Sequence, residues 1–311
     1  MDFKLITLGV SAAGPVPGRW PSGQFLKTAK TGFLLDAGEG IQIALQQNGI
    51  GWGSIDVILI SHLHGDHIYG LPGLLTSWGL NQRTAPLQII GPADLEPYLS
   101  TVFQYSHTGL PYPVTYKVVD FDTQGEHVFE DKDVSVRTLP LRHRVPTVGY
   151  VVAEKDRPRT MRGDQIKAFG IPFQEIPAIK DGADYVRPDG SVVPNSDLTL
   201  DPPPSRSFAY CSDTTPTPDL LPFIEGVDLL FHEATFLHEL KEQAAASMHT
   251  TALQAAEIAQ SAKVGQLILG HFSPRYGNLE PLLKEAQSVF PNTALAAEGR
   301  CFEVEYGGRK A

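Results

Sequence analysis

Four side chains of types that commonly bind metal ions stand within six consecutive residues of this chain: His62, His64, Asp66 and His67. They directly follow the apolar segment 56–61, which predicts a buried strand. Imidazole and carboxylate groups together suit zinc, and also iron or manganese. A single histidine here could belong to a surface loop without any metal. Four ligand-type side chains clustered at a strand end favour a metal site.

The spacing of the cluster suits two ions. His62 and His64 alternate along an extended segment, so both can face one ion from the same side. Asp66 and His67 come after Gly65, and a glycine permits a turn that aims them at a second ion. Because a zinc ion commonly has about four ligands, two ions require ligands from elsewhere in the chain.

Three further candidate ligands each follow an apolar segment: His143, Asp213 and His271. Taken alone, each is a polar residue after the end of a strand. Such residues are common and need not bind a metal ion. Together with the first cluster they complete two coordination sets. Asp213 can bridge the two ions, because a carboxylate offers two oxygens. The combined set predicts a metal-dependent hydrolase.

Short apolar segments alternate with helical patterns along the chain. The expected strands are residues 4–8, 32–36, 57–60, 87–90, 134–138, 149–153, 208–211, 229–231, 267–269 and 301–304. The expected helices are residues 40–47, 71–80, 93–103, 162–169, 251–262 and 279–289. This alternation predicts a layered α/β architecture. Residues 154–206 are polar and rich in turn residues, so we expect an arm inserted into a single domain, 1–311.

Charge and cysteine content limit the partners and the compartment. The formal net charge of −10 disfavours a general DNA- or RNA-coating protein, so any nucleic acid must be held by local basic residues or by metal. Neither Cys211 nor Cys301 lies in a CxxC pair, which favours reduced thiols in a cytoplasmic protein. No apolar run approaches the ~20 residues of a membrane helix, and the N-terminal segment predicts a strand, not a signal peptide.

Several segments match a known family. The motif at 62–67 resembles the metallo-β-lactamase superfamily. Three segments resemble, within it, the ribonuclease Z family of tRNA 3′-end processing endonucleases: His-Glu-Ala-Thr-Phe at 232–236, His-Thr-Thr at 249–251, and His-Phe-Ser-Pro-Arg-Tyr at 271–276. Further matches are Asp-Ala-Gly-Glu-Gly at 36–40 and Tyr-Cys-Ser-Asp-Thr at 210–214. The resemblance therefore covers nearly the whole chain.

The resemblance implies a four-layer αββα metallo-β-lactamase sandwich with an inserted arm and a site at one edge of the two sheets. It implies two zinc ions per chain, with manganese or iron as alternatives. One ion would be bound by His62, His64, His143 and Asp213. The other would be bound by Asp66, His67, Asp213 and His271.

The resemblance also implies a mechanism on RNA. Asp66 would orient the attacking hydroxide and accept its proton. His249 would protonate the leaving 3′ oxygen, because an imidazole titrates in a suitable range, and Glu233 would hold the other ring nitrogen of His249. Ser273 and Arg275 are candidates to bind a substrate phosphate. The expected function is a zinc-dependent endoribonuclease that removes the 3′ trailer of precursor tRNA.

The arm departs from the family pattern. Many family members carry an arm with a Gly-Pro motif and lysines that grips tRNA, whereas residues 168–182 here lack the Gly-Pro pair and place Lys180 among acids. Four nearby basic residues could replace that grip: Arg157, Arg159, Arg162 and Lys167. The family commonly forms homodimers in which the arm of one subunit serves the other. Precursor tRNA and a second copy of the chain are thus the expected partners.

Two alternative functions use the same fold. A hydrolase of small molecules such as cyclic nucleotides, lactones or thioesters would use the metal ligands, but the His-Glu-Ala-Thr and His-Thr-Thr segments argue against it. A non-catalytic nucleic-acid-binding protein would not require Asp66 or Asp213.

Overall fold

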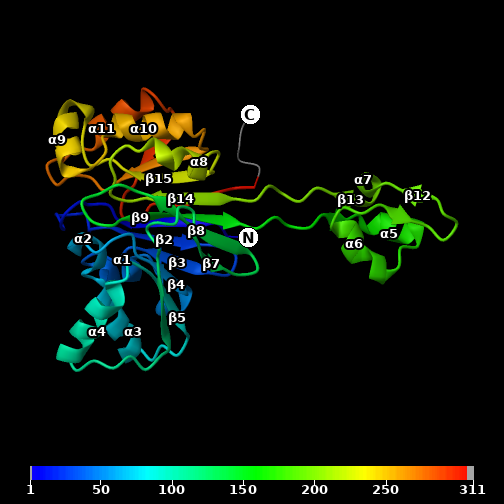
Figure 1. Ribbon diagram of the computed structural model, residues 1–311, viewed down its shortest axis with the longest axis horizontal. Helices are drawn as coiled ribbons and strands as arrows, with labels where there is room; N and C mark the ends of the chain where they lie inside the picture. The colour runs from blue at the N-terminus through cyan, green and yellow to red at the C-terminus, as the bar shows by residue number, and fades with distance from the viewer. Residues whose placement is uncertain (1, 307–311) are drawn as a thin grey trace.

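Two seven-stranded sheets stack face to face at the centre of the molecule, and helices cover the outer face of each (Figure 1). The computed structural model describes residues 2–306, so both ends of the domain expected over 1–311 lie outside the described residues. The layers run helix, sheet, sheet, helix. The expected four-layer αββα architecture is therefore confirmed.

The first sheet has the strand order β18-β1-β2-β3-β4-β5-β6. Its strands are β1 (Lys4–Gly9), β2 (Gly23–Lys27), β3 (Gly32–Leu35), β4 (Val57–Leu59), β5 (Leu87–Gly91), β6 (Val114–Val118) and β18 (Cys301–Glu303). Its outer face carries α1 (Ile41–Gln47), α2 (Gly65–Ile68), α3 (Leu71–Leu80) and α4 (Leu95–Tyr105). Strands β3 to β6 run parallel, so their carboxyl ends share one edge of the sheet.

The second sheet has the order β17-β16-β15-β14-β9-β8-β7. Its strands are β7 (His127–Glu130), β8 (Val134–Pro140), β9 (Val148–Glu154), β14 (Ser207–Cys211), β15 (Leu229–Glu233), β16 (Gln266–Gly270) and β17 (Thr293–Leu295). Its outer face carries α8 (Leu221–Ile224), α9 (Lys241–Ser247), α10 (Ala252–Ser261) and α11 (Glu280–Gln287). Strands β14 to β17 are parallel, which again gathers the loops after them at one edge.

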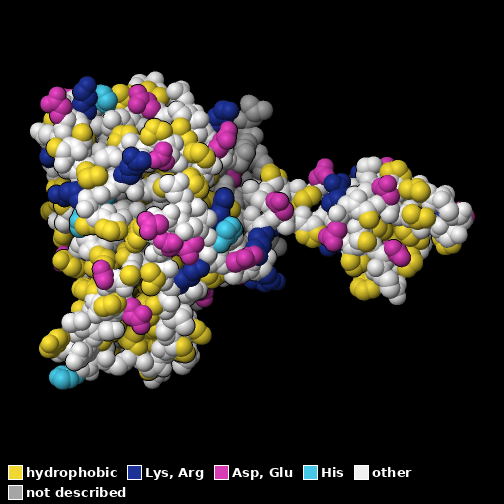
Figure 2. All heavy atoms as spheres, in the orientation of Figure 1, with side chains coloured by type: hydrophobic (Ala, Val, Ile, Leu, Met, Phe, Trp, Pro, Cys, Tyr) yellow, Lys and Arg dark blue, Asp and Glu magenta, His cyan; other side chains and the backbone are white. Residues whose placement is uncertain are grey.

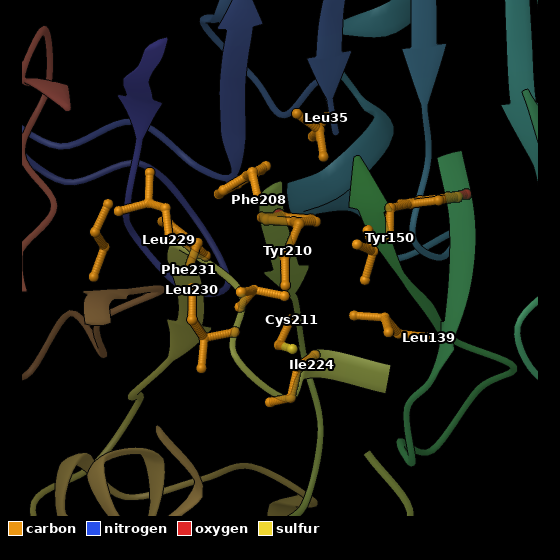
Figure 3. Packing of buried hydrophobic residues seen from close by; sticks show 14 of the residues in the cluster. Leu35, Leu139, Tyr150, Phe208, Tyr210, Cys211, Ile224, Leu229, Leu230 and Phe231 are labelled. Atoms are coloured by element: carbon orange, nitrogen blue, oxygen red, sulfur yellow. The ribbon is translucent and has the colours of Figure 1, made fainter. Parts of the chain in front are cut away.

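Apolar side chains from both sheets fill the space between them (Figure 3). Phe208 and Tyr210 of β14 point toward Leu35 of the first sheet, whereas Cys211 and Ile224 lie on the helix side (Figure 3). This two-residue alternation follows from the pleat of a strand. The packed interior gives the strand ends a rigid frame on which to position side chains.

All the strands and helices expected from the sequence are present, with ends within two residues of the expected ones. Four strands of the two large sheets were not expected: β2, β6, β7 and β17. Strand β2 shows why, because its sequence Gly-Gln-Phe-Leu-Lys has little local strand signal. It becomes a strand by pairing with β1 on one side and β3 on the other.

The arm at 154–206 projects from the sandwich as a small lobe on two extended segments (Figures 1 and 2). It contains α5 (Gly163–Phe169), α6 (Ile176–Lys180), α7 (Asn195–Leu198), β10 (Thr160–Met161), β11 (Tyr185–Val186), β12 (Val192–Val193) and β13 (Thr199–Leu200). Only the helix at 162–169 is expected from periodicity. The other elements pack around a separate apolar cluster that consists of Ile171, Ile179, Tyr185, Val193 and Leu198.

A buried ion pair closes the root of the arm. Arg206 donates from Nε to Glu154 Oε2 over 3.0 Å and from Nη2 to Glu154 Oε1 over 2.8 Å. Burial tends to raise the pKa of Glu154, but the hydrogen bonds from Arg206 hold it below its usual value. The two chain segments that lead into the arm are thus joined by a charged, two-pronged contact.

Candidate metal centre

The seven candidate ligands predicted from the sequence meet at one edge of the sandwich. They come from the loop after β4, from α2, from the β8–β9 loop, and from the loops after β14 and β16. Ligand atoms of His62, His64, His143 and Asp213 lie within 4.8 Å of one another. Those of Asp66, His67 and His271 form a second group by the same criterion. The first group has the members of the first expected set, and the second group has those of the second expected set except Asp213.

Asp213 lies between the groups and faces both. Its Oδ2 is 3.7 Å from Nε2 of His62 and 3.7 Å from Nε2 of His143. Its Oδ1 is 3.1 Å from Nε2 of His271 and 3.5 Å from Nε2 of His67. One oxygen is thus available to each set, which is the geometry that a bridging carboxylate requires.

Several candidate ligand atoms have no suitable hydrogen-bond partner among themselves, but could be satisfied by a metal ion. Nε2 of His62 faces Nδ1 of His64 at 3.1 Å, although a neutral ring offers only one N–H. Among the described residues, His143 Nε2 and Asp213 Oδ1 are buried without a hydrogen-bond partner. Unpaired buried polar atoms are costly, and coordination of a cation would satisfy both.

Groups behind the ligands fix which ring nitrogen points inward. The Nδ1 atom of His143 is 2.9 Å from the Met248 carbonyl oxygen, and that of His271 is 3.0 Å from Thr235 Oγ1. Nδ1 of His62 is 3.0 Å from Ser61 Oγ. With Nδ1 engaged, Nε2 remains for the metal, as is usual for histidine ligands.

Asp36 is a supporting residue to which the sequence analysis assigned no role. It is fully buried, adopts a left-handed φ of 57° directly after β3, and accepts hydrogen bonds at both oxygens. Oδ1 accepts from the Ser61 backbone N–H at 2.7 Å, and Oδ2 lies 2.8 Å from His67 Nδ1, Ser61 Oγ and Tyr210 Oη. One feature of the sequence could have indicated this role: an aspartate followed by Ala-Gly at the end of an expected strand.

Asp36→Asn should weaken metal binding about 10- to 100-fold, because an amide cannot accept from all these donors and leaves His67 misoriented. Competition with a chelator, read by metal analysis, measures the loss. Asp56→Asn is the matched control, since the Asp56 side chain accepts from the Gly32 N–H and belongs to neither ligand group. Unchanged metal affinity in Asp36→Asn would show that Asp36 supports the fold and not the ligand.

Gly65 does not form the turn that its position suggested. It begins α2 and is not among the described glycines with positive φ. A Cβ atom built on it would lie 2.2 Å from the Tyr69 ring. A larger residue at this position would displace the Tyr69 ring, which is 64% exposed. The first turn of α2 directs Asp66 and His67 toward the centre.

Asp66 reaches the centre from α2. The backbone N–H of Ala13 donates to its Oδ2 over 2.7 Å, and Nε2 of His271 and of His67 lie 3.4 and 3.6 Å from the same oxygen. Burial works to raise the pKa of Asp66, but the two imidazole rings hold it well below its usual range. Asp66 is thus a carboxylate available to a metal ion or to a water proton.

His249 and Glu233 form a directed pair beside the ligands. His249 Nδ1 is 2.8 Å from Glu233 Oε1. Glu233 is fully buried and also accepts from the N–H of Thr214 at 3.1 Å and from Thr235 Oγ1 at 2.7 Å. Burial tends to lower the pKa of His249, but the Glu233 carboxylate raises it to about 9. His249 can therefore carry a proton into the cavity at neutral pH.

A cavity of about 570 Å³ opens over the centre and is lined by Asp66, His249 and Ser273 among others. Arg275 is not among the described residues that line it. Its Nε donates to Ser273 Oγ over 3.0 Å, and its guanidinium lies over the Phe236 ring. Of the two phosphate-binding candidates, Ser273 faces the cavity and Arg275 stands behind it.

The comparisons with known proteins agree with this geometry. The family model described as "Beta-lactamase superfamily domain" matches residues 31–165 and 165–272. The chain is 42% identical over 303 residues to Ribonuclease Z of Phocaeicola vulgatus, which covers 97% of this chain and 98% of that protein. It is 43% identical to Ribonuclease Z of Bacteroides fragilis, with 97% and 99% covered.

Solved structures give the same picture. The human tRNase Z short form superposes with a TM-score of 0.70 at 25% identity, with 97% of this chain and 99% of that chain covered. The metallo-beta-lactamase fold protein YhfI of Bacillus subtilis superposes with a TM-score of 0.68 at 20% identity, covering 97% and 100%, which shows the fold alone. In the described part of the chain, no helix is both long and apolar enough to cross a membrane.

Proposed function

Since the chain belongs to the ribonuclease Z family of the metallo-β-lactamase superfamily, we propose that it hydrolyses the phosphodiester at the 3′ end of precursor tRNA and releases the 3′ trailer. It is a metal-dependent endoribonuclease. The observation that carries the proposal is the convergence of two ligand sets and the His249–Glu233 pair on one cavity. A hydrolase of this superfamily needs the ligands, and a poor leaving group such as a ribose 3′ oxygen also needs a proton donor.

The proposed metal content is two zinc ions per chain, with Asp213 between them. When bound, such ions lower the pKa of water and neutralise charge on the phosphate. The remaining steps use side chains of this chain. Asp66 orients the attacking water and takes its proton, and Ser273 donates to a phosphate oxygen. His249 protonates the leaving 3′ oxygen, while Glu233 holds the ring in place and stabilises its charged form.

We also propose that the arm binds tRNA and that the protein forms a homodimer. The arm is an insertion in a single domain, and the protein acts in the cytoplasm. The cations that the sequence offered are partly engaged: Arg157 pairs with Glu154, and Arg159 pairs with Asp201. Arg162 Nε donates to the Thr199 carbonyl oxygen over 3.2 Å. Among the described residues, no acid pairs with Arg162 or Lys167, so of the four candidates these two keep a charge for phosphate contacts, which is fewer than a basic arm would offer.

Incubation with a 3′-extended precursor tRNA tests the function. We expect one cut directly after the discriminator nucleotide, with a 3′-hydroxyl on the tRNA product and a 5′-phosphate on the trailer. A chelator should abolish the cut, and zinc should restore it. If the protein leaves the precursor intact but hydrolyses bis(4-nitrophenyl) phosphate, the substrate is a small phosphodiester and the tRNA proposal is wrong.

A further inference from the structure

A second cavity of about 500 Å³ adjoins the metal centre. Its walls are the loop at 120–124, the end of β8 with the β8–β9 loop at 138–148, and two further residues, Asp219 and Met248. Two residues, His143 and Arg144, line both this cavity and the one over the metal centre. The two spaces therefore meet at the β8–β9 loop, on either side of Arg144.

Arg144 stands at this junction without a partner. In the part of the chain that the structure describes, no hydrogen bond or ion pair engages its guanidinium, whereas the neighbouring Arg142 pairs with Asp219. Arg144 lines the cavity over the metal centre together with the candidate ligands His64 and His143. Arg144 is exposed, so its guanidinium is available to an anionic ligand beside the metal centre.

The second cavity has the size and lining for a nucleotide. Ligand pockets generally measure about 300–1,000 Å³. Phe121, which is 39% exposed, offers a ring on which a base can stack. Gln124 and Thr123 add polar groups that can contact base edges or sugar hydroxyls, and Val145 and Pro146 add apolar surface.

We propose that the second cavity is a nucleotide subsite and that Arg144 binds the phosphate next to the scissile one. The inference rests on the proposed function and deepens it. RNA would then cross the β8–β9 loop, with the scissile phosphate over the metal centre and a neighbouring nucleotide beside Phe121. The planar guanidinium suits two phosphate oxygens at once.

Arg144→Gln tests the phosphate contact. We expect kcat/KM for precursor tRNA to fall about 10-fold or more, mainly through KM. The slope of log kcat/KM against log salt should lessen by about 0.7, the value for one phosphate of a single strand. Hydrolysis of bis(4-nitrophenyl) phosphate, which has no second phosphate, should fall by a clearly smaller factor than cleavage of precursor tRNA. Metal content should stay the same.

The matched control is Arg137→Gln, which removes the same charge from β8 at a position that lines neither cavity. It should leave both substrates unaffected. Gln124→Trp fills the second cavity without a change of charge, and should raise KM for precursor tRNA alone. If Arg144→Gln slows both substrates equally, or affects neither, or if Gln124→Trp has no effect on KM, the subsite does not exist as proposed.

An error in the proposed function is distinguishable from an error in the subsite, because the wild-type protein itself would then leave precursor tRNA intact. Inhibition of bis(4-nitrophenyl) phosphate hydrolysis by a short single-stranded RNA then decides the subsite. Weaker inhibition of Arg144→Gln than of wild type and Arg137→Gln supports it, and equal inhibition of all three overturns it.

Discussion

Asp213→Ala should reduce phosphodiester cleavage on the order of 10³-fold or more and lower the metal content below two ions per chain. The reason is its position, because Oδ1 faces His67 and His271 while Oδ2 faces His62 and His143. No other described carboxylate offers an oxygen to both groups. Its loss leaves three protein ligands in each set. Metal analysis of the purified variant and single-turnover cleavage measure the two effects.

Asp94→Ala is the matched control for this substitution. Asp94 is an exposed carboxylate before α4 that lines neither of the two cavities. Its removal should leave the metal content and the rate close to wild type. Two tightly held ions in Asp213→Ala would contradict a bridging role, and a full rate with one ion would show that the second ion is not needed for the reaction.

His249→Ala should lower kcat for precursor tRNA about 10²- to 10⁴-fold, the range of a general acid, while both ions stay bound. The Nδ1 atom of His249 is held by Glu233, so Nε2 is the atom left to protonate a leaving group. A 4-nitrophenolate leaves without a proton. Hydrolysis of bis(4-nitrophenyl) phosphate should therefore fall far less than cleavage of tRNA. Glu233→Gln, which keeps the shape but removes the charge, should show a smaller effect in the same direction.

The structure also offers a competing role for His249. Its ring lies in a third group of metal-competent side chains, with Asp213 and His271. If it were a ligand, His249→Ala would lose metal and would slow both substrates alike. His238→Ala is the control, since His238 Nδ1 lies 3.1 Å from Thr251 Oγ1 and this histidine does not line the cavity over the metal centre.

The local sequence determined the positions of the main strands and the placement of the candidate ligands after them. Segments such as Phe208–Cys211 within β14 are apolar on both faces because they lie between the other sheet and a helix layer, so the strands can be recognised without tertiary knowledge. In a parallel sheet, residues directly after the strands meet at one edge. The same rule brings Asp213 and His271 together within the second sheet, and the stacking of the two sheets brings His62 beside them.

Long-range packing decided the rest. The support of His67 by Asp36 depends on a contact that no spacing rule predicts, whereas the contact of His249 with Glu233 was expected only from the family resemblance. Gly65 lies against the Tyr69 ring and does not form a turn. Arg144 resembles any surface arginine in the sequence, and only the meeting of two cavities around it points to a phosphate contact. Short-range patterns report how a segment is buried, whereas the partner of a polar side chain depends on which distant segments the fold brings beside it.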